Sequence, residues 1–253
     1  MLLHTHITGQ GQPVVLLHGL FGSYENLGMI ARSLSDNYQV INLDIRNHGR
    51  SGHSDNMDYP LMADDLAETL HHLNVMPYAI LGHSMGGKIT MQYAQQYPDT
   101  VEKIILADIA PVSYHSRHNK IFDGLSSVKL NELANRADAD KQLAAHIPEA
   151  GVRQFLLKSL IKKNDTFQWR FNLPALIKNY PQLVLAPAAE TPFTGPALFI
   201  KGSESDYILP EHKSVIMQRF PAAQAKVING TGHWLHAEKP AAFTKIVQDF
   251  LLS

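Results

Sequence analysis

The sequence contains no cysteine among its 253 residues. Without thiols, the chain has no disulfide bridge, no thiol nucleophile and no thiolate metal site. Covalent catalysis would then have to use an oxygen or nitrogen nucleophile from Ser, Thr, Lys, Asp or Glu. The missing residue type therefore narrows the search for reactive side chains before any motif is considered.

The sequence also lacks an excess of charge of either sign, because 22 Lys and Arg residues face 23 Asp and Glu residues. The resulting net charge of −1 supplies no global field that would attract nucleic acid or an anionic membrane surface. We therefore expect a small-molecule partner and no nucleic acid, with a monomer or a small homo-oligomer as the assembly.

Long hydrophobic runs are absent as well. No apolar stretch approaches the roughly 20 residues that a membrane-spanning helix needs. The first residues, MLLHTHITGQG, lack the basic and apolar regions of a signal peptide. These absences predict a cytoplasmic protein without a membrane span.

Short apolar, β-rich runs alternate with helical patterns along most of the chain. Such runs suit strands that are buried on both faces of a parallel sheet covered by helices. The pattern predicts an α/β fold with a mostly parallel central sheet flanked by helices. The predicted strands are VVLLH (14–18), YQVINLD (38–44), YAILGH (78–83), KIILADI (103–109), ALFIK (197–201) and AKVIN (225–229), and the predicted helices include NLGMIARSL, MADDLAETLHHL, KITMQYAQQY and AAFTKIVQDFLL.

The alternation is interrupted between the fourth and fifth predicted strands. Residues 112–193 contain helical patterns but no convincing strand, and the Pro-rich stretch LAPAAETPFTGP resembles a return linker. We predict one core domain, formed by residues 1–111 and 194–253, with a helical cap of residues 112–193 inserted before the penultimate strand.

The strongest local motif is Gly82-His83-Ser84-Met85-Gly86, between the run YAIL and the helical pattern KITMQYAQQY. In a strand-to-helix turn, G-x-S-x-G forms a nucleophile elbow, in which the flanking glycines allow close passage of neighbouring backbones. The alternative is an ordinary glycine-rich strand exit. The strand and helix on either side favour Ser84 as a nucleophile.

A serine hydroxyl is a poor nucleophile near neutral pH and needs a base within hydrogen-bonding reach. Elbow enzymes run in the chain order Ser, acid, His, with the histidine in a loop after the last strand. Of the fourteen histidines, His233 fits, because it follows AKVIN and precedes the last helical run. His236 is expected to pack near that helix. A metal site formed by both histidines is disfavoured, because no third ligand has a recognisable spacing.

Acyl transfer also needs donors aimed at the oxygen that becomes negative in the tetrahedral intermediate. The backbone N–H of Met85, at the start of the helix after the elbow, is one candidate. The second is assigned to the N–H of Leu20, in the loop after the first predicted strand, with Phe21 as the alternative. His18 is expected to shape this loop by a hydrogen bond and not to transfer protons.

Over essentially its whole length the sequence resembles the α/β-hydrolase superfamily. The similarity is strongest to the bacterial YbfF esterases and their mitochondrial relatives of the ABHD11 type. This resemblance implies the α/β-hydrolase fold and a serine esterase or thioesterase with a helical cap and no cofactor. The runs that carry it are HGLFGSYENL, DIRNHGRS, GHSMGGK, ADIAPVSYH, FLLKSL, WRFN and GHWLHAEKP, in that order.

Two aspartates compete for the role of the acid that orients His233. In most of the superfamily the acid follows the strand ALFIK, and Asp206 in DYILP resembles that loop, although its spacing from Gly202 is one residue longer than usual. The YbfF branch takes its acid after the preceding strand, at the position of Asp108. An ionised carboxylate at the end of a buried strand needs a partner such as imidazolium. The resemblance therefore favours Asp108, with Asp206 as the alternative.

Two further sets of residues are left out of the predicted site. The loop DIRNHGRS contains Asp44, Arg46, His48 and Ser51, and its place matches a structural loop of the superfamily. Arg170, next to Trp169, could meet an acidic substrate tail such as a coenzyme A phosphate. An internal ion pair is the more ordinary reading of such an arginine.

The predicted function is hydrolysis of a carboxylic ester or an acyl-CoA thioester through Ser84, His233 and Asp108. A cofactor-free perhydrolase or a carbon–carbon bond hydrolase would use the same three residue types. A ligand-binding protein with weakened turnover is the alternative from a different class, because one scaffold hosts unrelated functions.

Overall fold

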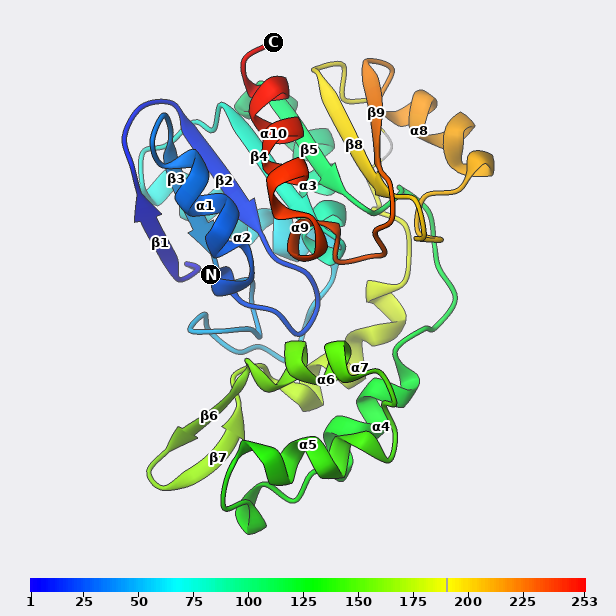
Figure 1. Cartoon of the computed structure of the whole chain (residues 1–253). Helices are drawn as coiled ribbons and strands as arrows, with labels where there is room; N and C mark the ends of the chain where they lie inside the picture. Colours follow the sequence, from blue (N-terminus) through cyan, green and yellow to red (C-terminus); the bar gives the residue numbers. More distant parts are fainter. Residues whose placement is uncertain (190) are drawn as a thin grey trace.

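The computed structural model describes residues 1–189 and 191–253, and its centre is a seven-stranded sheet (Figure 1). The strand order is β1-β3-β2-β4-β5-β8-β9. β1 pairs antiparallel with β3, and the other neighbours are parallel. The strands span Thr5–Thr8 (β1), Pro13–Leu17 (β2), Gln39–Leu43 (β3), Ala79–His83 (β4), Lys103–Ala107 (β5), Ala197–Gly202 (β8) and Ala223–Ile228 (β9).

The apolar runs of the sequence form the interior of this sheet. β4 and β5 are buried at every position, as expected for central parallel strands that are covered on both faces. The predicted α/β class and mostly parallel sheet are confirmed. β1 was not predicted, because its residues THIT carry no apolar run and belong to a partly exposed edge strand.

Helices cover both faces of the sheet. On one face, α1 (Gly28–Leu34) and α10 (Pro240–Leu251) pack against Leu16, Leu81 and Ile105 in a single buried cluster. On the other face, α2 (Tyr59–His72), α3 (Met85–Gln96) and α8 (Lys213–Arg219) contribute to a second and larger cluster. A short helix, α9 (Leu235–Glu238), follows β9 and precedes α10.

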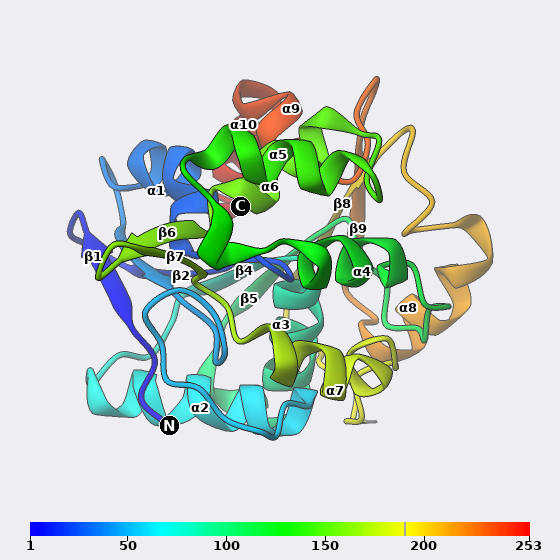
Figure 2. The same cartoon turned by 90° about the horizontal axis from the view of Figure 1, so that it is seen from below.

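The segment of residues 119–183 gathers at one end of the sheet, beyond the core helices (Figures 1 and 2). Several of its apolar side chains, such as Phe122, Leu156 and Phe171, join the larger core cluster. The described part of residues 112–193 therefore packs on the sheet end instead of standing apart. Its elements are α4 (Asn119–Ser127), α5 (Arg136–Ala144), α6 (Ala150–Leu157), β6 (Leu160–Lys163), β7 (Thr166–Trp169) and α7 (Leu173–Leu183).

The expectation that this segment contains no strand is wrong. β6 and β7 pair antiparallel, from Leu160 opposite Trp169 to Lys163 opposite Thr166. The two residues between them, Asn164 and Asp165, have φ values of 48° and 60°. A two-residue turn with both φ angles positive matches the twist of a hairpin and favours Asn and Asp. Within this segment, which was predicted to be helical, the run FLLKSLIKK changes from helix to strand.

Candidate active site

Ser84 lies between β4 and α3, with φ 53° and ψ −116°. This left-handed φ is uncommon for a residue other than glycine and marks a strained turn. The neighbouring backbones are so close that a Cβ added to Gly82 would lie 2.2 Å from the Gly86 oxygen. A Cβ on Gly86 would lie 2.3 Å from the Leu17 oxygen. Glycine at both positions therefore permits the turn that presents the Ser84 hydroxyl above the sheet.

His233 lies in the turn between β9 and α9 and reaches Ser84 across the sheet. Its Nε2 atom is 2.9 Å from Ser84 Oγ, and its Nδ1 atom is 2.8 Å from Asp108 Oδ2. With Nδ1 protonated, the ring donates to the carboxylate, and Nε2 is free to accept the serine proton. The structure thus brings together three of the residues selected from the sequence.

Asp108 directly follows β5 and has no solvent-exposed surface. Besides His233, its carboxylate accepts the Gly202 N–H at 3.1 Å and a short hydrogen bond from Ser205 Oγ. A buried carboxylate is costly unless such partners compensate it. Asp108 has a φ of 52°, so the backbone at the strand end is also in the left-handed region. Directional donors on three sides therefore hold this charge in place.

Asp206 lies elsewhere. Its side chain is 69% exposed, and its Oδ1 atom forms an ion pair with Arg117 Nη1 at 2.5 Å. The structure does not bring this carboxylate to His233, although Asp206 is only one residue from Ser205. The loop after β8 thus places a serine hydroxyl against Asp108 and turns its own carboxylate outward.

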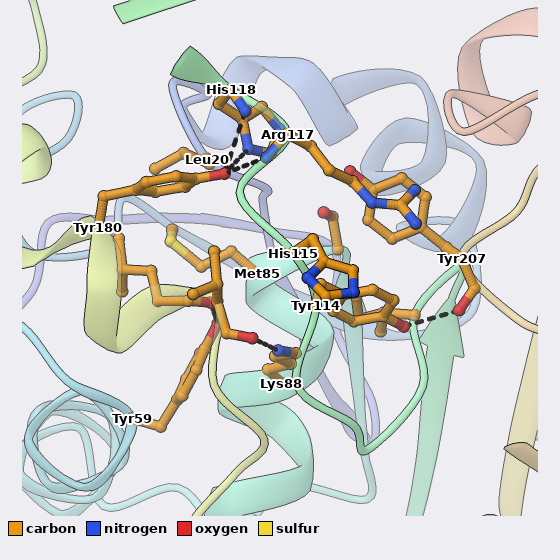
Figure 3. Close-up of a pocket in the computed structure, with 14 residues that line it drawn as sticks. Leu20, Tyr59, Met85, Lys88, Tyr114, His115, Arg117, His118, Tyr180 and Tyr207 are labelled. Carbon is orange, nitrogen blue, oxygen red and sulfur yellow. Dashed lines mark hydrogen bonds between the residues drawn. The ribbon is translucent and has the colours of Figure 1, made fainter.

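The two backbone amides selected as oxyanion donors belong to residues of the Ser84 cavity. Leu20 and Met85 both line the cavity that contains Ser84 (Figure 3). The alternative donor, the Phe21 N–H, already donates a hydrogen bond to His48 Nε2 at 3.1 Å. This hydrogen bond favours Leu20 over Phe21 as a donor to a bound oxygen.

Two buried histidines hold the loop that contains Leu20. His18 Nε2 accepts the Ile45 N–H at 3.0 Å, so its Nδ1–H donates to the Gly19 oxygen at 2.8 Å. His48 accepts from Phe21 and donates through Nδ1 to the Arg46 oxygen at 2.9 Å. Burial lowers the pKa of both rings, that of His48 to about 3. Both histidines are therefore neutral supports, as expected for His18.

The loop DIRNHGRS makes structural contacts throughout. Asp44 accepts the backbone N–H groups of Tyr24 and Arg50, and Arg46 forms a two-pronged ion pair with Asp65. Gly49 has a φ of 57°, and a Cβ there would collide with the Asp44 carboxylate. None of these contacts involves Ser84 or His233.

Arg170 is engaged within the protein. Both of its terminal nitrogens lie 3.1 Å from Oε1 of Glu25, in the 3-10 helix Tyr24–Leu27 before α1. Trp169 stacks on Phe171, with ring centroids 5.4 Å apart and an interplanar angle of 7°. The internal ion pair with a packed indole is thus the arrangement that the structure contains.

Two cavities meet at Ser84. The first lies toward α3 and the end of α7, and Figure 3 shows the aromatic and basic side chains that surround it. The second lies toward His233 and Trp234 and is lined by Val152, Phe155 and Leu156 from the α6 region. Leu20, Ser84, His118 and Tyr207 belong to both linings.

Tyr207 separates the site from the solvent-exposed ion pair. Its ring stacks on the imidazole of His233, with centroids 3.8 Å apart and an interplanar angle of 14°. The guanidinium of Arg117 lies 4.7 Å from the centre of the Tyr207 ring. The phenol ring of Tyr207 therefore lies between the imidazole of His233 and the guanidinium of Arg117. This stacking restricts the rotation of the His233 ring away from Asp108.

Sequence reasoning missed several supporting residues. Ser205 and Tyr207 were not predicted, because only the aspartate of their loop was matched to a pattern of catalytic residues. His83, the variable residue of the elbow motif, donates from Nε2 to the His233 oxygen at 2.9 Å, and its burial lowers its pKa well below the usual value. Its neighbour His236 is buried between His83 and Phe243 and has a pKa lowered by burial to about 3.

Within residues 1–189 and 191–253, no cluster of three or more His, Asp or Glu side chains is arranged to hold a metal ion. In the same ranges, no helix combines the length and the apolar character that a bilayer crossing requires.

A strained serine between a parallel strand and a helix, with a histidine and an aspartate from later loops, defines the class of α/β proteins that contain a nucleophile elbow. A family model described as alpha/beta hydrolase fold matches residues 12–240, and the chain belongs to this family.

The chain is 42% identical over 243 residues to Esterase YbfF of Escherichia coli (strain K12), covering 94% of this chain and 92% of that protein. It is 38% identical over 246 residues to the sn-1-specific diacylglycerol lipase ABHD11 of Mus musculus, covering 94% of this chain and 80% of that protein. The solved structure of a marine microorganism esterase aligns with a TM-score of 0.96 and 39% identity, over 98% of this chain and 99% of that chain. The resemblance inferred from the motifs is confirmed.

Proposed function

We propose that the protein is a serine esterase that hydrolyses carboxylic esters or acyl-CoA thioesters through an acyl-enzyme. The observation that carries the proposal is the continuous hydrogen-bonded line from Ser84 Oγ through His233 to Asp108, with contacts of 2.9 and 2.8 Å. The similarity to proteins named as esterases and a diacylglycerol lipase supports the same reaction class.

In this mechanism, Ser84 Oγ attacks the carbonyl carbon while His233 Nε2 takes the hydroxyl proton. His233 then gives that proton to the leaving alcohol or thiol, and the acyl group remains on Ser84. A water molecule, deprotonated by the same nitrogen, attacks the acyl-enzyme and releases the acid. Asp108 keeps the Nδ1 proton in place and compensates the imidazolium, which forms twice in each turnover.

The oxygen of the tetrahedral intermediate would be bound by the backbone N–H groups of Leu20 and Met85. Both residues line the Ser84 cavity, and the Met85 amide opens α3, where the positive end of the helix dipole favours an anion. The hydrogen bond that the Phe21 N–H donates to His48 supports the choice of Leu20 over Phe21.

The two cavities would bind the two parts of the substrate, the leaving group and the acyl chain. The leaving group must accept its proton from His233, so it belongs in the cavity lined by His233 and Trp234. The acyl chain then occupies the other cavity, toward Lys88 and α7. We further propose that residues 112–193 act as a cap on the core of residues 1–111 and 194–253, because both cavities combine residues of the two segments.

The test is hydrolysis of p-nitrophenyl esters and acyl-CoAs by wild type and Ser84→Ala, with labelling by a fluorophosphonate probe. We expect Ser84→Ala to lose at least about a thousandfold in kcat/KM and all labelling. Ser203→Ala, which removes an exposed hydroxyl outside the site, should retain both. Ester turnover that survives in Ser84→Ala would reject the proposal. Activity on esters but not on acyl-CoAs would limit it to carboxylic esters.

A further inference from the structure

The C-terminal end of α7 is held by side chains of the core. The last carbonyl groups of a helix have no partner within the helix and must find one elsewhere. The Leu183 oxygen accepts from the Tyr59 hydroxyl at 2.6 Å, and the Val184 oxygen accepts from the Tyr114 N–H at 2.8 Å. The ammonium group of Lys88 donates to two oxygens, at 3.1 Å to Val184 and at 2.5 Å to Leu185. Three consecutive carbonyls are therefore satisfied from α2, α3 and the chain after β5.

Lys88 is unusual because this long cationic side chain is only 1% exposed. Its described contacts are the two carbonyls and the faces of Tyr114 and Tyr59, whose ring centroids lie 4.7 and 5.5 Å from Nζ. The negative end of the α7 dipole and the electron-rich ring faces both favour a cation at this point. Burial lowers the pKa of the Lys88 ammonium to about 7. The mechanism proposed above assigns this buried group no role.

Lys88 also borders the proposed acyl cavity. It follows Ser84 by four residues, which is one turn or about 6 Å along the helix axis. Leu183 and Val184 line the same cavity as Ser84, so the chain segment that Tyr59 and Lys88 hold forms part of its wall. The hydroxyl groups of Tyr59, Tyr114 and Tyr180 are all engaged in hydrogen bonds to other protein groups. The wall therefore offers hydrocarbon and ring surface to a bound chain.

We propose, on the basis of the function proposed above, that Lys88 determines acyl-chain specificity. By holding the Val184 and Leu185 carbonyls, it fixes Leu183 and Val184 as the end wall of the acyl cavity and limits the substrate to short, apolar acyl chains. Lys88 does not touch the reacting atoms. It acts through the position of the α7 end.

Replacing Lys88 by methionine keeps an unbranched chain and removes all three donors. The Leu185 carbonyl would then lose the donor that Lys88 supplies, and the Val184 carbonyl would keep only the Tyr114 N–H, so we expect the end of α7 to move toward water. The cavity should lengthen as a result. We expect the ratio of kcat/KM for p-nitrophenyl octanoate to that for the acetate to rise about tenfold in Lys88→Met, mainly through a lower KM for the octanoate.

Lys103 supplies a matched control. It is also a buried lysine, with Nζ 3.0 Å from the Ser253 oxygen and 4.8 Å from the centre of the Tyr78 ring. It lies on β5 and is absent from the linings of both cavities at Ser84. Lys103→Met should lose stability in a similar way without changing the octanoate-to-acetate ratio.

Tyr59→Phe gives a second and milder variant, because it removes only the donor to the Leu183 oxygen. The ratio should rise in the same direction by about threefold, since one neutral hydrogen bond is lost. Tyr59→Phe decides the question if circular dichroism shows that Lys88→Met does not fold. An unchanged ratio in the folded variants, or an equal loss for both esters, overturns the assignment of Lys88 alone. A wild type without Ser84-dependent ester turnover overturns the proposed function together with this assignment.

Discussion

Asp108 and Asp206 follow neighbouring strands of the sheet, yet their surroundings are opposite. Asp108 is fully buried and accepts hydrogen bonds from Gly202, Ser205 and His233. Asp206 is 69% exposed and pairs with Arg117. In the interior, each charge needs several directional partners, and those partners fix its position. At the surface, water and salt supply most of the stabilisation, and the pair contributes little.

The same difference separates two larger groups of residues. We call Asp108, His18, His48, His83 and His236 the buried frame. We call the ion pairs Arg117–Asp206 and Arg170–Glu25 the exposed rim. Members of the frame are buried, whereas the rim joins the segment after β5 to the core at the surface. We expect function and stability to depend on the frame much more than on the rim.

The largest difference is expected between the two aspartates. Asp108→Asn keeps the shape of the side chain but favours the wrong tautomer of His233 and removes the charge that compensates the imidazolium. We expect kcat/KM for p-nitrophenyl butyrate to fall by about 10⁴, whereas Asp206→Asn should remain within about threefold of wild type. An inactive Asp206→Asn together with an active Asp108→Asn would contradict the role of Asp108 as the acid that orients His233.

The second prediction concerns acid stability. Burial holds the pKa of His48 and that of His236 at about 3 in the folded protein, below the usual 6.5 of an unfolded chain. The unfolded state therefore binds more protons below pH 6.5, so stability is greatest above that pH and falls as the pH decreases toward 3. Each such histidine should lower the free energy of unfolding by about 2 kcal/mol at pH 5 relative to pH 8.

Urea unfolding followed by circular dichroism at pH 8, 7, 6 and 5 measures this loss. His236→Phe removes one titrating ring. The fall in unfolding free energy between pH 8 and pH 5 should therefore be smaller by the amount expected for one histidine, about 2 kcal/mol. His71→Gln, at an exposed position of α2, should leave the slope unchanged. A stability that does not vary between pH 8 and pH 5 would show that the buried rings are protonated in the fold.

The third prediction tests a neutral member of the Asp108 surroundings. Ser205→Ala removes the short hydrogen bond to Asp108 Oδ2 and leaves the carboxylate with the Gly202 amide and His233. Hydrogen bonds to charged groups are worth more than neutral ones, so we expect kcat/KM to fall by about 10- to 100-fold. Ser203→Ala, two residues earlier and exposed, provides the control. Equal kcat/KM values in the two variants would show that the Ser205 hydroxyl does not contribute to catalysis.

The smallest effect is expected at the rim. A double-mutant cycle of Glu25→Ala and Arg170→Ala should give a coupling free energy below about 1 kcal/mol in urea unfolding. The ratio of acyl-CoA to simple ester hydrolysis should stay constant in Arg170→Ala, because the guanidinium is already paired with Glu25. A selective loss of acyl-CoA hydrolysis would instead indicate that Arg170 leaves Glu25 to contact the substrate.

Several features of the fold could be read from the sequence because they depend on local composition. Buried parallel strands need apolar residues on both faces, so β4 and β5 stand out in any composition-based reading. The hairpin of β6 and β7 was missed, although the pair Asn164-Asp165 is typical of a two-residue turn. Its strands are only four residues long, and the first continues the apolar spacing of α6. Short elements of this kind are decided by their tertiary contacts.

The sequence by itself determined the elbow at Ser84 and the order of the elements around it, because strain and close backbone contact restrict those positions to particular residues. It left open the choice between Asp108 and Asp206, and between the amides of Leu20 and Phe21. Only the tertiary structure decided where these groups lie, since the hydrogen bonds from Phe21 to His48 and from Ser205 to Asp108 join residues that are far apart in the chain. The strength and direction of such contacts depend on burial and distance, which one sequence does not specify.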